Sequence, residues 1–329
     1  MLIPVVGEPI SREPAQRPDG VVWRIEEAVA GAVLGKPDAV RLALTALLAE
    51  GHLLIEDVPG VGKTTLARAM AAVVEGACRR IQFTPDLMPS DVTGLTLFDQ
   101  AAGEFEFHPG PVFANVVIAD EINRASAKTQ SALLEVMEEG SVTVDGISHP
   151  VPRPFLVVAT QNPVDLDGTY RLPGAQLDRF LMRISVGYPD EDTEVEVARG
   201  AAAGRPVRDC PPVADMRTLR ELIKLTGRIH VADPLYRYAV RLAAATRAHP
   251  QVRVGVSPRG VIALTRAARA YAHLAGRGYV LPEDVKALVE PVFAHRLTLT
   301  QDARAREVSP TTVLRTVAEN VPAPVPVRT

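Results

Sequence analysis

The feature that most constrains this chain of 329 residues is a glycine-rich turn between an apolar run and a stretch with helical spacing. The apolar run covers residues 53–55, the turn covers 57–64, and the helical pattern follows at 66–70. A strand that leads through such a turn into a helix points several backbone N–H groups at one anion. The sequence therefore predicts a cradle for nucleotide phosphates at the edge of an α/β domain.

The turn departs from the phosphate-binding pattern G-x-x-x-x-G-K-[ST] at its first position alone. Lys63 supplies a positive charge for the phosphates, and the Thr64 hydroxyl is a ligand for Mg²⁺. Asp57 stands where the pattern asks for glycine, so its carboxylate must point away from the phosphates or lower the affinity for the nucleotide. The residues that we expect to hold the nucleotide are Pro59, Gly60, Val61, Gly62, Lys63, Thr64 and Thr65.

The composition of the chain narrows its functional class. Apolar residues make up 47% of the sequence, and a chain of this length favours about two domains. The net charge of −3 provides no basic field for nonspecific nucleic-acid binding, so nucleic acid is not an expected partner. No apolar run is long enough to span a membrane. Cys78 and Cys210 lie far apart without metal-binding spacing, so we expect two reduced thiols in a cytoplasmic protein.

The order of apolar patterns predicts a parallel sheet. Short β-type runs lie at 53–55, 81–83, 116–119, 155–159 and 181–186. Helical patterns separate most of them, as crossover helices do in an α/β core. After residue 189 the pattern is almost entirely helical. We therefore expect five parallel strands flanked by helices, followed by a smaller all-α domain. The expected division of the chain is a flexible arm (1–20), the α/β core (21–189), the all-α domain (190–318) and a flexible tail (319–329).

Two segments of the core have the pattern of inserted hairpins. Residues 95–108 contain two β-type runs around Gly103, and residues 141–151 contain Asp145 and Gly146, a pair typical of hairpin turns. One insert precedes the strand at 116–119 and the other follows it.

Paired acids, Asp120 and Glu121, end the strand at 116–119. With a phosphate cradle upstream, Asp120 is placed to hold Mg²⁺ through water, and Glu121 to orient and deprotonate an attacking water. Two solvated carboxylates at the end of a core strand are the alternative. The upstream turn favours the catalytic interpretation.

Asn162 follows the strand at 155–159. Ligands of open parallel sheets bind beyond the carboxyl ends of the strands, so Asn162 should face the same crevice as Lys63 and Asp120. Its amide can bind the γ-phosphate or the attacking water, whereas by itself an Asn before Pro163 is more often a turn residue.

Two arginines complete the candidate set. Arg179 directly precedes the last strand, and Arg259 lies in the first turn of a helix that Ser257 is expected to cap. Taken singly, each is more often a surface ion pair than a catalytic group.

These motifs, in this order, resemble the AAA+ ATPases and specifically the MoxR family. The resemblance rests on the turn at 57–64, on the stretches 120–125, 159–163, 177–180 and 257–259, and on residues 82–94, which look like the family's own signature. It extends from about residue 29 to about residue 314. The AAA+ family implies a P-loop core followed by an all-α lid.

The resemblance assigns roles to single residues. It implies Lys63 and Thr64 as Walker A, Asp120 and Glu121 as Walker B, and Asn162 as sensor 1, acting on ATP with Mg²⁺. Arg259 is implied as sensor 2. Arg179 is our candidate for the arginine finger that reaches the nucleotide of a neighbouring subunit, with Arg124 and Arg171 as competitors.

The resemblance also implies partners. The family forms ring-shaped homo-oligomers, expected here to be hexamers, that remodel protein clients, assist maturation or insert metal cofactors together with a von Willebrand factor A domain protein. The two hairpins fall where the family has its helix-2 insert and its pre-sensor-1 insertion, which line the pore or contact clients.

Two other functions share the same core. A nucleic-acid motor of the helicase or helicase-loader kind should present Lys or Arg on its inserts, whereas here the tips carry Asp99, Glu104 and Asp145. A nucleotide-gated scaffold with negligible turnover would not need Glu121, which is intact.

Overall fold

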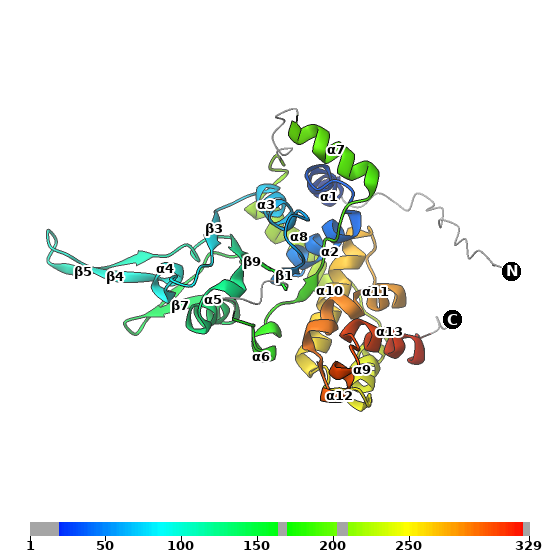
Figure 1. The fold of residues 1–329 in the computed structure, drawn as a ribbon. Coiled ribbons are helices and arrows are strands. Elements are labelled where there is room, and N and C mark those ends of the chain that lie inside the picture. Colours follow the sequence, from blue (N-terminus) through cyan, green and yellow to red (C-terminus); the bar gives the residue numbers. More distant parts are fainter. Residues whose placement is uncertain (1–19, 164–169, 203–209, 325–329) are drawn as a thin grey trace.

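In this computed structural model the described residues are 20–163, 170–202 and 210–324 (Figure 1). Most of the expected N-terminal arm and the last residues of the expected tail lie outside this range. Five strands form a parallel sheet in the order β10-β1-β9-β6-β3. Their bounds are β1 Leu53–Glu56, β3 Cys78–Gln82, β6 Val116–Asp120, β9 Leu156–Gln161 and β10 Met182–Ile184. The five-stranded parallel sheet and the α/β class predicted from the sequence are confirmed.

The register of the sheet brings the motif-bearing strand ends together. In β1, Leu53 pairs with Val158 of β9 and with Met182 of β10. On the other side of β9, Val158 pairs with Ile118 of β6. Because all five strands run in one direction, their carboxyl ends share one edge, which is where parallel sheets bind ligands.

Alternation along each strand divides the core into two layers. In β1, Leu53 and Ile55 face a cluster that includes the helices before and after the sheet, whereas Leu54 faces the opposite cluster. The same alternation separates Val116 from Val117 in β6. The inner strands β1, β6 and β9 are therefore buried on both faces, as expected for a parallel sheet, whereas most residues of the edge strand β3 are exposed.

Six helices lie within the described part of the core. They are α1 Gly20–Ala32, α2 Pro37–Leu48, α3 Lys63–Ala72, α4 Pro89–Thr93, α5 Ala127–Glu139 and α6 Gly174–Leu177, and a short 3-10 turn, η1 Ile122–Arg124, precedes α5. Ser126 caps α5 by accepting a hydrogen bond from the N–H of Thr129. Gly140 ends α5 with a φ of +65°. That left-handed conformation suits glycine and turns the chain into the second hairpin.

Two hairpins extend from the core. The first pairs β4 Gly94–Asp99 with β5 Glu104–Pro109, and the second pairs β7 Ser141–Val144 with β8 Ile147–Pro150. Figure 1 shows both reaching away from the C-terminal helices. The rings of Phe107 and His149 stack at 4.1 Å between centroids, which joins the two hairpins near their bases.

The chain after the sheet is mainly helical. Its helices are α7 Glu191–Ala202, α8 Met216–Arg228, α9 Asp233–Ala248, α10 Pro258–Leu274, α11 Pro282–Phe293, η2 Ala294–Arg296, α12 Gln301–Ala305 and α13 Pro310–Asn320. Two short strand pairs accompany them. β11 Ala214–Asp215 pairs with β2 Val74–Glu75 of the core, and β12 Val252–Val254 pairs with β13 Thr298–Leu299. The central helix α10 packs on α2, α8, α9 and α11. Within the described part of the chain, no helix has both the length and the apolar character needed to cross a bilayer.

A buried histidine just before β1 joins α5 to β9. His52 Nδ1 accepts a hydrogen bond from the N–H of Val157 at 3.0 Å, and Nε2 lies 3.1 Å from the carbonyl oxygen of Met137. These partners fix a neutral imidazole that donates through Nε2. Burial lowers the pKa of His52 from 6.5 to about 4, with Arg266 and Arg153 adding to the effect.

This histidine predicts a pH dependence of stability. Because the pKa of His52 is lower in the folded chain, the unfolded chain binds more protons between pH 4 and 6.5. The free energy of unfolding should fall as the pH drops from 6.5 to 4, by on the order of 3 kcal/mol from this group. His52→Gln keeps an acceptor and a donor but cannot be protonated. Urea unfolding should show a smaller pH slope for the variant, and equal slopes would contradict the assignment.

Candidate active site

A cavity of about 370 Å³ lies at the carboxyl edge of the sheet. It is lined by Pro59, Gly60, Gly62, Lys63, Thr64, Thr65, Arg80, Gln82, Asp120, Glu121, Thr160 and Asn162. The structure thus brings together the turn after β1, the acids that end β6 and the asparagine after β9. These residues come from positions more than 100 apart in the chain, and the shared strand direction places them in one cavity.

The turn after β1 has the backbone of an anion cradle. Gly60 and Gly62 have φ values of +84° and +93°, a region that favours glycine. Gly62 is the N-cap of α3, and no side chain caps this helix end, so its first N–H groups are available to a phosphate. The Lys63 ammonium group donates to the carbonyl oxygen of Val58 at 2.9 Å and also to that of Asp57. The lysine therefore lies over its own turn.

The carboxylate of Asp57 points away from this cradle. Its Oδ2 accepts hydrogen bonds from Ser185 Oγ (2.5 Å), Val186 N (2.9 Å) and Gly187 N (2.7 Å), just beyond β10. Burial raises the pKa of Asp57, but these bonds and one from the N–H of Val58 outweigh it and lower the pKa overall. Asp57, which replaces the glycine of the pattern, therefore connects the P-loop to residues 185–187 after β10.

The donor set at the end of β6 fits a hard divalent cation. Asp120 is almost fully buried, and its Oδ1 accepts hydrogen bonds from Thr64 Oγ1 at 3.2 Å and from Thr160 Oγ1 at 2.9 Å. Carboxylate and hydroxyl oxygens are ligands that Mg²⁺ prefers, usually together with substrate phosphates. Thr64 and Asp120 would hold the ion, with Thr160 fixing the carboxylate.

Arg80 and Gln82 are site residues that the sequence analysis missed. Arg80 Nε lies 2.7 Å from Asp120 Oδ2 and compensates the buried charge. Gln82 accepts from Arg80 and donates to Glu121 Oε2 at 3.1 Å. The two residues are two positions apart in β3, so their side chains lie on the same side of the strand. The end of β3 lies beside the end of β6, where Gln82 pairs with Asp120. Gln82 begins the family-like stretch 82–94, which was the available signal for this residue, and Arg80 lies two residues before it.

The catalytic candidate Glu121 has an unusual backbone. Its φ is +54°, and its N–H donates to Thr160 Oγ1 at 3.0 Å. This conformation turns the side chain toward Gln82 and toward Arg124, whose guanidinium lies 3.0 Å from Glu121 Oε2. Arg124 therefore pairs with the acid of its own chain.

Asn162 lines the same cavity and is buried. Its backbone carbonyl accepts a hydrogen bond from Asn123 Nδ2 at 3.2 Å, which ties the end of β9 to η1. The structure places Asn162 in one cavity with Lys63 and Asp120.

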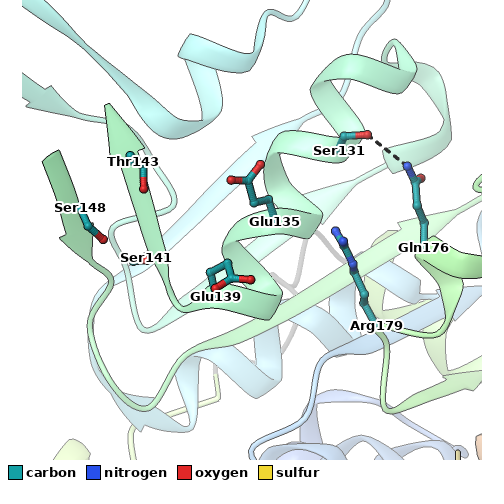
Figure 2. A pocket seen from close by; sticks show the side chains of 8 residues that line it. All are labelled: Ser131, Glu135, Glu139, Ser141, Thr143, Ser148, Gln176 and Arg179. Atoms are coloured by element: carbon teal, nitrogen blue, oxygen red, sulfur yellow. Dashed lines mark hydrogen bonds between the residues drawn. The ribbon is translucent and has the colours of Figure 1, made fainter. Parts of the chain in front are cut away.

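Arg179 and Arg259 lie elsewhere. Both guanidinium groups bind Glu138 of α5, Arg179 at 2.9 Å and Arg259 at 3.0 Å, and neither arginine is among the residues that line the P-loop cavity. A second cavity of about 630 Å³ lies on the Arg179 side. Figure 2 shows Arg179 extending toward α5, where Glu135 and Glu139 line that cavity. The competitor Arg171 is exposed.

The expected cap of α10 is wrong. Ser257 occupies the N-cap position, but its side chain makes no cap hydrogen bond. The N–H of Gly260 instead donates to the backbone carbonyl of Ser257 at 3.0 Å. The tight first turn satisfies this donor, so the hydroxyl is not needed.

The chain is similar to known proteins along most of its length. Residues 52–182 match the family described as ATPase family associated with various cellular activities (AAA), and residues 244–317 match the AAA lid domain. It is 47% identical to protein YeaC of Bacillus subtilis (89% of this chain and 92% of the relative) and 44% identical to chaperone MoxR1 of Mycobacterium tuberculosis (89% and 79%). The crystal structure of a putative ATPase from Cytophaga hutchinsonii superposes with a TM-score of 0.85 at 35% identity, covering 93% of this chain and 96% of that one.

The role of Asp57 gives a testable outcome. Asp57→Gly restores the strict P-loop pattern but removes the acceptor of the bonds from Ser185, Val186 and Gly187. We expect the free energy of unfolding at pH 7 to fall by about 1 kcal/mol, at the low end for bonds to a charged group because solvent reaches this site. Urea unfolding measures the change, with Asp57→Asn as the matched control of intermediate effect. A more stable Asp57→Gly variant would contradict the connecting role of Asp57.

Proposed function

The chain belongs to the MoxR family of AAA+ ATPases and hydrolyses ATP, and we propose that it works as a Mg²⁺-dependent ring, with six subunits, that remodels protein clients. The observation that carries this proposal is the division of the candidate residues between two sites. Lys63, Asp120 and Glu121 share one cavity, whereas Arg179 and Arg259 meet on Glu138 outside it. Within one subunit, neither arginine therefore lines the cavity that would hold the phosphates.

Within one subunit, the residues of the cavity divide the work of hydrolysis. The N–H groups that open α3 and the Lys63 ammonium group bind the phosphates once the lysine leaves its carbonyl partners. Glu121 accepts a proton from the attacking water, and Asn162 orients that water or the γ-phosphate. Thr64 and Asp120 would hold Mg²⁺, which when bound would neutralise charge on the phosphates.

The position of the two arginines supports the proposed ring. Arg179 and Arg259 are exposed in part, and both are presented on one surface by Glu138. A head-to-tail arrangement, with this surface against the P-loop of the next subunit, supplies the missing positive charge and closes into a ring. An arginine supplied in this way accelerates phosphoryl transfer by about 10³- to 10⁵-fold.

The first hairpin, β4–β5, is our candidate for the client contact. Its apolar side chains Leu97, Phe98 and Phe105 are exposed at 47%, 52% and 74%, and Phe98 packs edge-on against Phe105 at 5.2 Å. Exposed aromatic clusters of this kind mark binding surfaces. We propose that ATP-driven movement of this hairpin acts on a client, assisting the maturation of protein complexes, including metal-cofactor insertion.

The remaining family expectations belong to the same proposal. A von Willebrand factor A domain protein is the proposed partner that delivers clients. We place the protein in the cytoplasm, where ATP is available and where Cys78 and Cys210 stay as free thiols.

A nucleic-acid motor is disfavoured by charge. Residues 94–109 and 141–150 contain no Lys or Arg, so neither hairpin offers phosphate contacts. A scaffold without turnover is disfavoured by Glu121, which has its hydrogen-bonded place in the cavity. Strong stimulation of ATP hydrolysis by single-stranded DNA would instead favour the nucleic-acid motor.

Mixed rings test the trans arginine. Arg179→Ala and Glu121→Gln subunits should each be nearly inactive alone, because one lacks the finger and the other lacks the base. In an equal mixture about a quarter of the interfaces combine an intact P-loop site with an intact finger. Phosphate release should therefore return to about a quarter of wild type. Absence of recovery, with mixed assembly shown by crosslinking, would refute Arg179 as the trans finger.

A client trap tests the remodelling function. Glu121→Gln should hold ATP without hydrolysis and so retain bound protein clients in a pull-down. Adding Phe98→Ser and Phe105→Ser should lower client recovery about tenfold, since exposed aromatic anchors dominate such interfaces. Ile262→Ser on α10, an equally exposed apolar residue, is the matched control. Recovery of nucleic acid alone, or equal recovery in all variants, would count against the proposal.

A further inference from the structure

A buried arginine from the C-terminal helices holds the segment that carries Arg179. Arg296 ends η2, and its side chain is only 3% exposed. Its Nε lies 2.7 Å from Asp178 Oδ1, and its Nη2 donates to the carbonyl oxygen of Phe180 at 2.7 Å. Its Nη1 donates to the carbonyl oxygen of Leu181 at 3.2 Å. One guanidinium group therefore binds the residues on both sides of Arg179.

This arrangement needs an arginine. Burial lowers the pKa of Arg296, and the Asp178 carboxylate opposes that effect, so the group stays cationic. The planar guanidinium group reaches a carboxylate and two carbonyl oxygens at once. An ammonium group in its place keeps the charge but cannot reproduce this fixed set of directions.

The same segment is fixed from the opposite side. Phe180 is fully buried in the layer of the core that contains α5, and Arg179 itself binds Glu138 of α5 at 2.9 Å. The chain at 178–181 thus lies between α5 and the C-terminal helices, and the Arg179 guanidinium group emerges at that junction.

Gly260 lets the turn that bears Arg259 approach Arg296. A Cβ atom at Gly260 would lie 2.5 Å from Val256 Cγ1 and 3.0 Å from Arg296 Cδ, so only glycine permits this contact. Arg259, next to it, shares Glu138 with Arg179. Arg179 and Arg259 therefore meet on Glu138 beside the segments that Arg296 contacts.

We propose that Arg296 is a positioning residue that makes the placement of Arg179 depend on the placement of the C-terminal helices. A movement of η2 relative to the sheet would carry the 178–181 segment with it and withdraw or present the finger. This inference rests on the proposed role of Arg179 in the neighbouring site, and it adds that the C-terminal helices control that role.

Arg296→Lys tests the geometry without removing the charge. A misplacement of about 1 Å can cost about 10²-fold in rate, so kcat should fall by that order while ATP affinity, measured by fluorescent-nucleotide binding, stays unchanged. Arg277→Lys is the matched control, because Arg277 also pairs with a buried acid, Asp284, in the C-terminal helices but has no bond to residues 178–181. An unchanged kcat for Arg296→Lys would overturn the proposal.

Mixed rings separate positioning from a general loss of structure. Arg296→Lys subunits should recover about a quarter of the activity when mixed with Glu121→Gln, which supplies a sound finger, and none when mixed with Arg179→Ala. The reverse pattern would place the defect in the P-loop site and overturn the inference. Recovery in neither mixture, with intact assembly, would also overturn it.

Two further controls keep the outcome decisive. Asp178→Asn weakens the contact between Arg296 and residue 178 by removing the negative charge. This variant should also recover activity with Glu121→Gln and not with Arg179→Ala, so it replaces Arg296→Lys if that variant does not fold. If Arg179→Ala with Glu121→Gln shows no recovery, the proposed trans site itself fails. If that pair recovers and the Arg296 pattern does not appear, only the positioning role fails.

Discussion

The buried carboxylate of Asp120 is the interaction on which the nucleotide site depends. It lies at the end of β6, where Thr64, Thr160 and Arg80 all contact it. A buried charge of this kind is costly unless it is paired and hydrogen-bonded, and here three different elements supply the partners. The start of α3, the end of β9 and the strand β3 are thereby held at fixed distances around one point.

Two other polar contacts connect this site to the rest of the chain. Asp57 binds the backbone just after β10, and Arg296 binds the backbone just before it. The short strand β10 is thus held at both ends, by the P-loop on one side and by the C-terminal helices on the other. Because the segment before β10 carries Arg179, the contact of the P-loop with this strand and the position of Arg179 both depend on β10.

Much of the fold could be predicted from the sequence because its signals are local. Apolar runs of strand length located the five strands within a few residues, and the Asp145-Gly146 pair marked a turn that the structure has between β7 and β8. Asp120 and Asn162 were placed in one cavity because parallel strands end at a common edge. Arg80 and Gln82 escaped notice, since alternation along a strand does not tell which face meets a carboxylate. The prediction that the Ser257 side chain caps α10 was wrong, because the N–H of Gly260 donates to the backbone carbonyl of Ser257 instead of to its hydroxyl.

The sequence by itself determined the α/β class, the order of the strands along the chain and the chemical groups at the strand ends. Each of these depends on residues within one strand or one turn of each other. Only the tertiary structure decided that Asp57 points away from the phosphates, and that Arg179 and Arg259 meet on Glu138. These contacts join residues from 41 to 130 positions apart, and no local pattern encodes them. They follow from how the helices and the sheet pack, which is why the division of the candidate residues between two sites became visible only in the folded chain.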